Sequence, residues 1–395
     1  MDIQFLILLT LFTKSNCDLV LKQVLILSRH NVRTPLAKNL ELMTPKIWPV
    51  WKEKRGYLTA KGALLEGFMG AYFSKWLQKE GLLTDQCPTE QELYVYANSA
   101  QRTVASAQAF VDDGFPGCNV TVHSQTNSDP IFNPIVHNKT AAYKQEALDQ
   151  MQKKLRLLSL KSCYDQIEKI LDYEQSKLCL EQGKCDLNTD KNQPYVAAGA
   201  KPNLTGPLKI SKSAIDSFIM ENYEGFHSNE VAWGMLPNEQ KWYSIIDLSR
   251  GYHNVIFNTT VIAKDVAKPL VKYMSEMLLK DDPPKVLFLM GHDANIYTVL
   301  NLMGFKPYYL EKQYEVTPAG GKIVFQKWWD KKIKQYFLKV NYVYQSTDGM
   351  RKGYRLSLEY PPEFTLLELN GCTINNEGYC PWQDFKKLLT KFISA

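Results

Sequence analysis

The sequence predicts an α/β fold, with a mainly parallel sheet flanked by helices and an inserted, mostly helical cap subdomain. Three observations predict this fold. Apolar stretches at 23–28, 92–97 and 285–290 each run into a polar loop and then into a helical pattern. Nearly continuous apolar runs are typical of strands covered on both faces, and strands that alternate with helices pair in parallel. Between 135 and 249 the apolar residues recur mostly at helical spacing, which predicts the cap.

The boundaries of these parts are expected where the pattern changes. We expect the α/β part at 18–134 and 250–395, and the cap at 135–249. Within the cap, a loop-like span between Asn188 and Pro207 is rich in Asn, Pro and Gly. The chain therefore leaves the α/β part once and returns to it.

Three further elements follow from local patterns. Residues 59–81 predict the clearest helix, because apolar side chains recur at helical spacing and Thr59 can cap its start. The alternating stretches 321–330 and 335–345 predict an antiparallel hairpin at a sheet edge. Residues 381–393 predict a helix that closes the chain, with a proline near its first turn.

The N-terminus carries a ten-residue apolar run at 3–12, which is shorter than the roughly 20 residues that cross a bilayer. Ser15 and Cys17 stand at the −3 and −1 positions of a cleavage site before Asp18. We therefore interpret 1–17 as a signal peptide, with a buried N-terminal strand as the alternative. Secretion is expected, or a periplasmic location if the source is bacterial. No later stretch reaches transmembrane length, so no membrane attachment is expected after cleavage.

Cysteine usage agrees with export. Seven cysteines remain after cleavage, and two pairs are close in sequence, in "CLEQGKC" and "CTINNEGYC". Zinc ligation is an alternative, but these gaps do not fit short C-x(2–4)-C knuckles, and small disulfide-closed loops are favoured. An odd count leaves one thiol over, and Cys163 is the candidate because it lies in a helical pattern. Four glycosylation sequons are expected to be used: Asn119, Asn138, Asn203 and Asn258.

Charge and composition narrow the ligand class. The 395 residues are 45% hydrophobic, enough for a large core, and the net charge is +6 without any block of five like charges. Nucleic-acid binding is therefore not indicated, whereas a small anionic substrate is compatible with this charge. The oligomeric state is left open between monomer and homodimer.

Polar residues follow each of the three predicted strands. Ligands of open α/β sheets bind at the carboxyl ends of strands, so these residues are expected to converge. Arginines suit bidentate recognition of phosphate, and a histidine nitrogen can attack phosphorus and form a phosphohistidine. A carboxyl beside the site can protonate the leaving group, and the scheme requires no metal or cofactor. The candidate site residues are Arg29, His30, Arg33, Arg102, His292 and Asp293.

A structural role is the alternative for each of these residues taken singly. R-H-x-x-R and a His-Asp pair are both common by chance, and His30 alone fits a hydrogen-bonded core histidine. Their joint occurrence after apolar strands favours the functional interpretation. The four other histidines lack this context and are predicted to be structural or superficial: His123, His137, His227 and His253.

The motif "RHNVRTP", with a distal "GHDAN", resembles the histidine acid phosphatase family, a branch of the histidine phosphatase superfamily. Further segments are similar to its bacterial glucose-1-phosphatase and phytase-type members, among them "YANSAQRTVASAQAFVDDGFPGCNVTVH", "NYEGFHSNEVAWG" and "LNGCTINNEGYCPWQDF". The resemblance runs from about Gln23 to the C-terminal helix. It implies that the chain has the fold and the phosphatase chemistry of that family.

By matched position, His30 resembles the family's nucleophile and Asp293 its proton donor, while the phosphate clamp is matched by Arg29, Arg33, Arg102 and His292. The resemblance also implies three disulfides and leaves Cys163 unpaired: Cys87–Cys118, Cys179–Cys185 and Cys372–Cys380. One position departs from the glucose-1-phosphatase pattern. Lys201 stands where those enzymes have an acidic residue at the substrate mouth, so a narrow preference for glucose-1-phosphate is in doubt.

The function expected from residues and resemblance together is that of a secreted acid phosphatase. Its substrates would be sugar phosphates, with inositol phosphates as a further class, and hydrolysis would pass through a phosphohistidine. A dedicated phytase is the alternative within this chemistry. A catalytically inactive secreted binding protein is the alternative outside it, and is disfavoured because every catalytic position is filled. A phosphoglycerate mutase is disfavoured by the leader and the cysteines.

Overall fold

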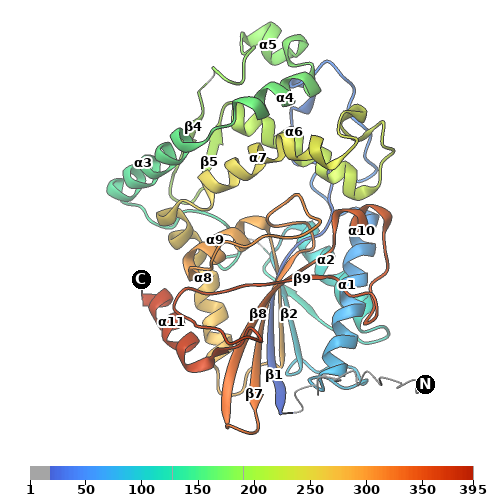
Figure 1. The fold of residues 1–395 in the computed structure, drawn as a ribbon, viewed down its shortest axis with the longest axis vertical. Coiled ribbons are helices and arrows are strands. Elements are labelled where there is room, and N and C mark those ends of the chain that lie inside the picture. The colour runs from blue at the N-terminus through green and yellow to red at the C-terminus, as the bar shows by residue number, and fades with distance from the viewer. Residues whose placement is uncertain (1–17, 127, 190, 395) are drawn as a thin grey trace, which may run out of the picture.

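The computed structural model describes residues 18–126, 128–189 and 191–394, and the molecule has two lobes (Figure 1). The lower lobe in that view is a sheet covered by helices, and the upper lobe is mostly helical. The signal peptide predicted at 1–17 lies outside the described residues. In the described part of the chain, no helix is long and apolar enough to cross a membrane.

The central sheet combines a parallel half with an antiparallel half. Its strand order is β10-β8-β7-β1-β6-β2-β3, and β9 pairs with β8. The parallel strands are β1 (Leu19–Arg29), β6 (Val286–Gly291), β2 (Leu93–Ala97) and β3 (Val122–Ser124). The antiparallel strands are β7 (Lys322–Asp330), β8 (Gln335–Tyr344), β9 (Glu363–Leu366) and β10 (Cys380–Pro381).

The predicted α/β class is confirmed, and the three strands expected from the sequence are adjacent in the sheet. The predicted hairpin is β7–β8, but it does not form the sheet edge itself. β7 pairs with β1 on one side, and the short strands β9 and β10 pair with the outer side of β8. These two strands are too short for a periodic pattern to predict them.

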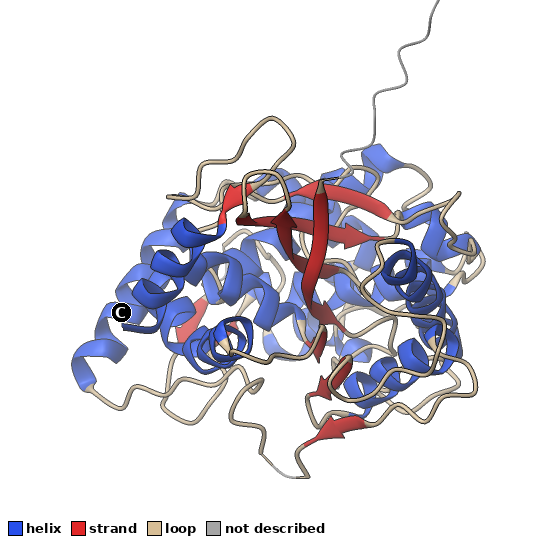
Figure 2. Ribbon diagram, turned by 90° about the horizontal axis from the view of Figure 1, so that it is seen from below, coloured by secondary structure: helices blue, strands red, loops and turns tan. Residues whose placement is uncertain are grey.

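Helices cover both faces of the sheet (Figure 2). Side chains alternate along β1, so Val24 and Ile26 pack with one helix layer while Leu25 and Leu27 pack with the other. This two-sided burial explains the continuous apolar run. One layer is α1 (Ala60–Lys79) and α2 (Gln101–Gly114); the other is α8 (Thr260–Leu279), α9 (Asp293–Met303) and α11 (Trp382–Ser394).

The helix predicted at 59–81 is α1, and its start is capped as expected, because the Thr59 side chain accepts from the Gly62 N–H. α1 and α2 pack closely where Gly70 meets Gly114. A Cβ on Gly70 would collide with the Phe110 carbonyl, so glycine allows the two backbones to approach. This contact sets the position of α2, whose first turn carries Arg102.

The cap is built around an apolar core that contains residues of α4, α6 and α7 and continues into the α/β lobe, where it includes Val32, Leu65 and Tyr297. Its helices are α3 (Ala141–Leu157), α4 (Lys161–Leu171), α5 (Lys177–Gln182), α6 (Pro207–Glu224) and α7 (Glu239–Ile256). The span expected to be a loop contains a small antiparallel hairpin of β4 (Gln193–Tyr195) and β5 (Asn203–Thr205). α7 runs unbroken across 249/250, so that expected boundary falls inside a helix, and the domain boundaries stay a prediction.

Short helices complete the described chain: 3₁₀ helices at Leu40–Leu42, Tyr173–Gln175 and Val231–Gly234, and α10 at Thr347–Lys352. The three cysteine pairs implied by the resemblance lie bonded, with Cα–Cα distances of 5.3, 4.3 and 5.7 Å. Cys163 is free among the described cysteines and lies on α4. Of the four sequon asparagines, Asn119 and Asn138 are exposed, while Asn203 and Asn258 are half-buried; their use stays a prediction.

Candidate active site

The carboxyl ends of β1, β6 and β2 meet at one edge of the sheet. Arg29, the last residue of β1, pairs with Gly291, the last residue of β6, and the His30 N–H donates to the Gly291 carbonyl at 3.0 Å. The Asn98 N–H, just after β2, donates to the Met290 carbonyl at 3.0 Å. The register of three neighbouring strands therefore starts all three functional loops side by side, as the sequence predicted.

His30 is buried in a defined tautomer. Its Nδ1 lies 2.8 Å from the Asn31 carbonyl oxygen, and since a carbonyl can only accept, Nδ1 carries the proton. Nε2 is then left with a lone pair. Burial, followed by the charges of Arg102 and other cations around it, holds the pKa of His30 well below its ordinary value. The imidazole is therefore neutral and suited to nucleophilic attack.

Arg29 and Arg33 are 1% and 2% exposed, so their charges need partners. Arg29 donates to Glu315 at 2.9 Å and to the Thr317 carbonyl. Arg33 makes a bidentate pair with Asp216 of α6, at 3.0 and 2.9 Å. Burial alone would lower the pKa of Arg29, but Glu315 raises it above the ordinary value. Both guanidinium groups are therefore held in place as cations.

Arg102 lies in the first turn of α2. Its Nη2 is 3.3 Å from His292 Nδ1. Burial, and then the like charge of Arg33, lowers the pKa of Arg102 to about 10, so it stays charged at acid and neutral pH. Among the described residues, Arg102 has no carboxylate within ion-pair distance, unlike Arg29 and Arg33.

Each of the three arginines has one buried hydrogen-bond donor without an acceptor. The Nε–H groups of Arg29, Arg33 and Arg102 are all buried and have no hydrogen-bond acceptor among the described residues. Buried donors are rarely left unsatisfied, and each costs about 1–3 kcal/mol. Three such donors around one imidazole indicate that an anion with several acceptor oxygens completes this site.

His292 and Asp293 begin α9. His292 Nε2 lies 2.8 Å from Asn98 Oδ1, so His292 donates to Asn98 and presents Nδ1 to Arg102. Asp293 Oδ1 accepts from the Ala294 N–H at 2.8 Å. Its Oδ2 is 3.5 Å from Nε2 of His253 on α7. Asp293 therefore lies at a helix N-terminus, where negative charge is favourable.

Opposing effects act on the Asp293 carboxyl. Burial would raise its pKa, but His253, Arg29 and Lys201 together hold the pKa well below its ordinary value. The carboxyl is therefore ionised while the clamp is empty. An anion in the clamp would offset these cations and raise the proton affinity of Asp293.

A fully buried polar network supports the loop after β1. Lys322 pairs with Glu66 at 2.6 Å and also donates to Ser28. Glu66 in turn accepts from Asn31 at 2.8 Å. Gly320, with a φ of +68°, lies so close to Asn31 that a Cβ would collide with it. The network thereby fixes the carbonyl that sets the His30 tautomer.

All six residues predicted to form the catalytic group and the clamp lie together. Lys201 is exposed, and its ammonium lies 5.2 Å from the centre of the Phe257 ring, where it acts electrostatically on Asp293 and Arg102. Of the remaining histidines, His137 and His227 are exposed, and His123 pairs with Glu90. These three agree with the structural or superficial role predicted for them.

Sequence reasoning missed several residues at the site. His253 was grouped with the structural or superficial histidines, but it is buried against Asp293 and stacks on Tyr297 at 5.0 Å. Asp216 and Glu315, which hold the arginines, were not singled out. Asp216 is 183 positions from Arg33, and neither acid belongs to a local motif, so no pattern in the sequence pointed to them.

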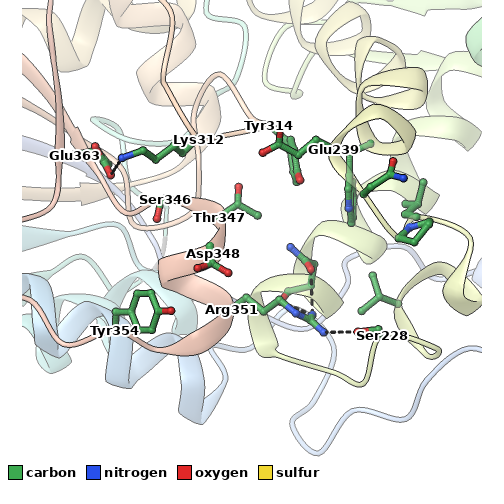
Figure 3. Close-up of a pocket in the computed structure, with 16 residues that line it drawn as sticks. Ser228, Glu239, Lys312, Tyr314, Ser346, Thr347, Asp348, Arg351, Tyr354 and Glu363 are labelled. Carbon is green, nitrogen blue, oxygen red and sulfur yellow. Dashed lines mark hydrogen bonds and ion pairs between the residues drawn. The ribbon is translucent and has the colours of Figure 1, made fainter.

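A separate cavity of about 720 Å³ lies where the cap meets the segments before β7 and after β8 (Figure 3). Its cations are already engaged: Lys312 pairs with Glu363 at 2.9 Å, and Arg351 donates to Asn222 at 3.0 Å and to the Phe226 carbonyl at 2.7 Å. No candidate clamp residue lines it. It is therefore distinct from the candidate active site.

A neutral nucleophilic imidazole within three arginines, at the carboxyl edge of an α/β sheet, defines a phosphoryl-transfer enzyme. Comparison with known proteins gives the family. Residues 20–343 match the histidine phosphatase superfamily (branch 2), and the chain belongs to that family. It is a phosphoric monoester hydrolase of the histidine acid phosphatase type, and the resemblance found in the sequence is confirmed.

Curated relatives cover almost the whole chain. A glucose-1-phosphatase of Providencia rettgeri is 44% identical over 96% of this chain and 93% of its own length. The phytase AppA of Escherichia coli is 29% identical, with coverages of 96% and 94%. Among solved structures, the Citrobacter braakii phytase has a TM-score of 0.86 at 28% identity, covering 95% of this chain and 98% of that one. A Hafnia alvei phytase in complex with myo-inositol hexakis sulphate has a TM-score of 0.85 at 29% identity, with coverages of 96% and 98%.

Proposed function

We propose that this chain is an exported acid phosphatase that hydrolyses phosphate monoesters in two steps through a phosphohistidine on His30. The observation that carries the proposal is the set of three buried, unpaired Nε–H donors of Arg29, Arg33 and Arg102 around a neutral imidazole. A phosphoryl group supplies the missing acceptors, and it places phosphorus where Nε2 can attack.

In the first step, His30 Nε2 forms a bond to phosphorus while the bond from phosphorus to the ester oxygen breaks. Asp293 donates its proton to that oxygen, so the product leaves as a neutral alcohol. The arginines neutralise the equatorial oxygens, over which charge is spread in the transition state. In the second step, water attacks the phosphohistidine and gives a proton to Asp293. Phosphate leaves, and His30 returns to its starting form.

The electrostatics support an acid optimum. Asp293 must carry a proton when the ester bond breaks, yet the cations around it favour the carboxylate in the empty site. A bound phosphoryl group offsets these cations and raises the pKa of Asp293. Low pH then favours the protonated acid that the first step needs.

Glucose-1-phosphate-like sugar phosphates are the proposed substrates, with inositol phosphates as a further class. The names of the relatives, glucose-1-phosphatase and phytase, support both classes. A dedicated phytase is the second candidate, favoured by Lys201 near Asp293, because a lysine there attracts additional phosphates. An inactive binding protein has the least support, because His30 and Asp293 are both in place.

The test uses one preparation of the purified mature enzyme. Phosphate release at acid pH is measured from p-nitrophenyl phosphate, glucose-1-phosphate and phytate, and the phosphoenzyme is trapped by rapid quench with ³²P-labelled substrate. Acid-labile label that maps to the His30 peptide is expected. Turnover without such label would contradict the two-step mechanism. N-terminal sequencing of exported protein would test cleavage before Asp18.

A further inference from the structure

The turn between β7 and β8 lies at the opposite end of the sheet from the candidate active site (Figure 1). Leu19, the first residue of β1, pairs with Asp330 at this turn. The candidate site begins at Arg29, the last residue of β1. From the rise of a strand, the two ends of β1 are about 30 Å apart. A surface that binds the turn therefore leaves the active site open to solution.

The turn holds three lysines around one isoleucine. Lys331, Lys332, Ile333 and Lys334 are all exposed, and Ile333 is 52% exposed. Asp330 fixes their arrangement, because its Oδ1 accepts from the N–H groups of Lys332 at 2.8 Å and Ile333 at 3.1 Å. The Lys334 N–H donates to the Asp330 carbonyl at 3.0 Å and closes the turn. The turn therefore presents one apolar side chain and three cations together.

Lys334 occupies a position that does not suit a lysine. Its φ is +57°, in the left-handed region that glycine and asparagine adopt more readily than other residues. The backbone of the turn therefore gives no reason for a lysine at this position. The positive charge is the property that the side chain adds.

Further cations lie beside the turn. Lys22 is exposed at the irregular position of β1. Burial, and then the charge of Lys386 on α11, lowers the pKa of Lys327 on β7. In the described part of the chain, these lysines and those of the turn have no carboxylate within ion-pair distance, in contrast to Lys387 of α11, which pairs with Asp384. We call the following six side chains the basic end: Lys22, Lys327, Lys331, Lys332, Lys334 and Lys386.

The basic end has few carboxylates to balance it. Asp18 accepts from the Lys331 N–H through its carbonyl, so it lies at this end together with Asp330. The six lysines exceed these two acids by four, out of a net charge of +6 for the whole chain. Like charges held close together repel one another, and an anionic partner surface relieves that repulsion.

Two aromatic rings lie directly behind the turn. Trp329 and Tyr336 pair across the hairpin, with ring centres 4.5 Å apart. Tyr336 is 41% exposed, and the Lys327 ammonium lies 4.9 Å from the centre of its ring. Tryptophan and tyrosine are enriched where lipid headgroups meet acyl chains, and lysine side chains extend from there to the headgroups. Together with Ile333, these rings favour a lipid surface over a soluble polyanion, which would need only the cations.

We propose that the β7–β8 turn docks the enzyme on membranes that contain anionic lipids. The lysines of the basic end bind the headgroups, and Ile333 enters the apolar edge of the bilayer. The sequence predicted no membrane attachment because it has no spanning segment, but docking on a surface does not require one. The inference goes beyond the proposed function and is independent of it, because the turn and the active site lie at opposite ends of β1.

The test measures co-sedimentation of the purified mature enzyme with vesicles of phosphatidylcholine, alone or mixed with phosphatidylglycerol. The wild type should bind only the anionic vesicles, and added salt should weaken the binding. A triple variant with Lys331→Gln, Lys332→Gln and Lys334→Asn should lower the partition coefficient about fivefold per lysine. Asparagine is chosen at position 334 because it tolerates the left-handed conformation. Ile333→Ser leaves the charge unchanged and should lower the partition coefficient about tenfold.

The matched control removes three lysines from exposed positions on the cap, by Lys139→Gln, Lys144→Gln and Lys153→Gln. It should bind the anionic vesicles as the wild type does. Hydrolysis of p-nitrophenyl phosphate should be unchanged in every variant and in the vesicle-bound wild type. Thermal unfolding shows that the variants are folded even if the protein hydrolyses no phosphate ester, so failure of the proposed function leaves this test intact.

Three outcomes would overturn docking on lipid. The first is a wild type that does not bind anionic vesicles. The second is binding that the triple variant retains, or that the cap control loses equally, because binding would then depend on net charge alone. The third is unchanged vesicle binding in Ile333→Ser together with binding to dextran sulphate that the triple variant loses, which would assign the turn to soluble polyanions.

Discussion

The two lobes build the candidate site in different ways. The α/β lobe supplies His30, Arg29, Arg102 and Asp293 from adjacent strand ends, and each belongs to a short motif after an apolar strand. The cap supplies Asp216 from α6, His253 from α7 and Lys201 from the segment before α6, without any local motif. In the proposed mechanism, the α/β lobe supplies the catalytic residues. The cap holds the arginine clamp in position and contributes to the choice of substrate.

This difference shows how catalysis and substrate selection are divided between the two lobes. Reactive groups need fixed mutual geometry, and a hydrogen-bonded sheet edge gives it. Selection needs charge at a distance from the reacting atom, and a helix that packs over the edge can provide this along its length. Substitutions of the catalytic residues in the α/β lobe should therefore abolish turnover. Substitutions in the cap should alter the substrate preference, the pH dependence of the rate or the position of the clamp arginines.

Removing the nucleophile should have the largest effect. His30→Ala should lower turnover by a factor of 10² to 10⁴ or more, because the other imidazole of the clamp, His292, has both ring nitrogens engaged, by Arg102 and by Asn98. A rapid denaturing quench at alkaline pH, where a phosphohistidine is stable, should trap label on the wild type and none on the variant. His227→Ala, at an exposed position, is the control. Residual turnover above about 1% would indicate another nucleophile.

Asp293→Asn should reduce the rate of hydrolysis most for esters with poor leaving groups. Glucose-1-phosphate needs its ester oxygen protonated, whereas p-nitrophenolate leaves without help, so the rate loss should be larger for the sugar phosphate. The ratio of the two losses is the measurement, with Asp282→Asn, on the exposed surface, as the control. Equal losses would leave Asp293 as a positioning residue. Chelating agents should change neither rate, because the proposed clamp draws its charge from arginines.

Asp216→Asn tests whether the cap aligns the clamp. The variant keeps one acceptor oxygen but loses the second acceptor and the carboxylate charge that hold Arg33, so kcat/KM should fall by up to about 100-fold for every substrate. Breaking this buried pair should also cost about 3 kcal/mol of unfolding free energy. Asp247→Asn, which breaks the surface pair with Arg250, should change neither quantity measurably. Full activity in Asp216→Asn would show that Arg33 is held without the cap.

Lys201→Glu should shift preference by a smaller factor. A carboxylate at this position would repel the additional phosphates of phytate, so kcat/KM for phytate should fall about fivefold more than that for glucose-1-phosphate. The difference between the falls in kcat/KM for the two substrates should become smaller as ionic strength rises. An unchanged ratio at low salt would show that Lys201 does not face the substrate.

His253 should produce the smallest effect, a shift in the pH profile. His253 lowers the pKa of Asp293, so replacing it with Phe should raise that pKa. The acid then keeps its proton to higher pH, and the alkaline limb of the kcat profile should move upward. His253→Gln retains a hydrogen-bond donor and should move it less. Shifts of equal size in the two variants, or no shift in either, would leave His253 with a packing role against Tyr297 alone.

How far the sequence predicted this molecule depends on the range of the interactions involved. The strand at 23–28, the helix at 59–81 and the hairpin at 321–345 follow from patterns of side-chain burial within a few turns or pleats. The hairpin inside 188–207 was missed because strands of three residues carry no measurable period. The position of β7 inside the sheet was missed because pairing partners are set by long-range register.

The sequence by itself determined that six candidate residues lie at one edge of the sheet. The reason is that neighbouring parallel strands end at the same edge, so the loops that follow them lie side by side whatever the arrangement of the rest of the chain. Only the tertiary structure decided that Asp216 holds Arg33 and that His253 lies beside Asp293. These contacts depend on the rotation and height at which α6 and α7 pack over the sheet. That packing is determined by the apolar core that the cap shares with the α/β lobe, and no local stretch of sequence records it.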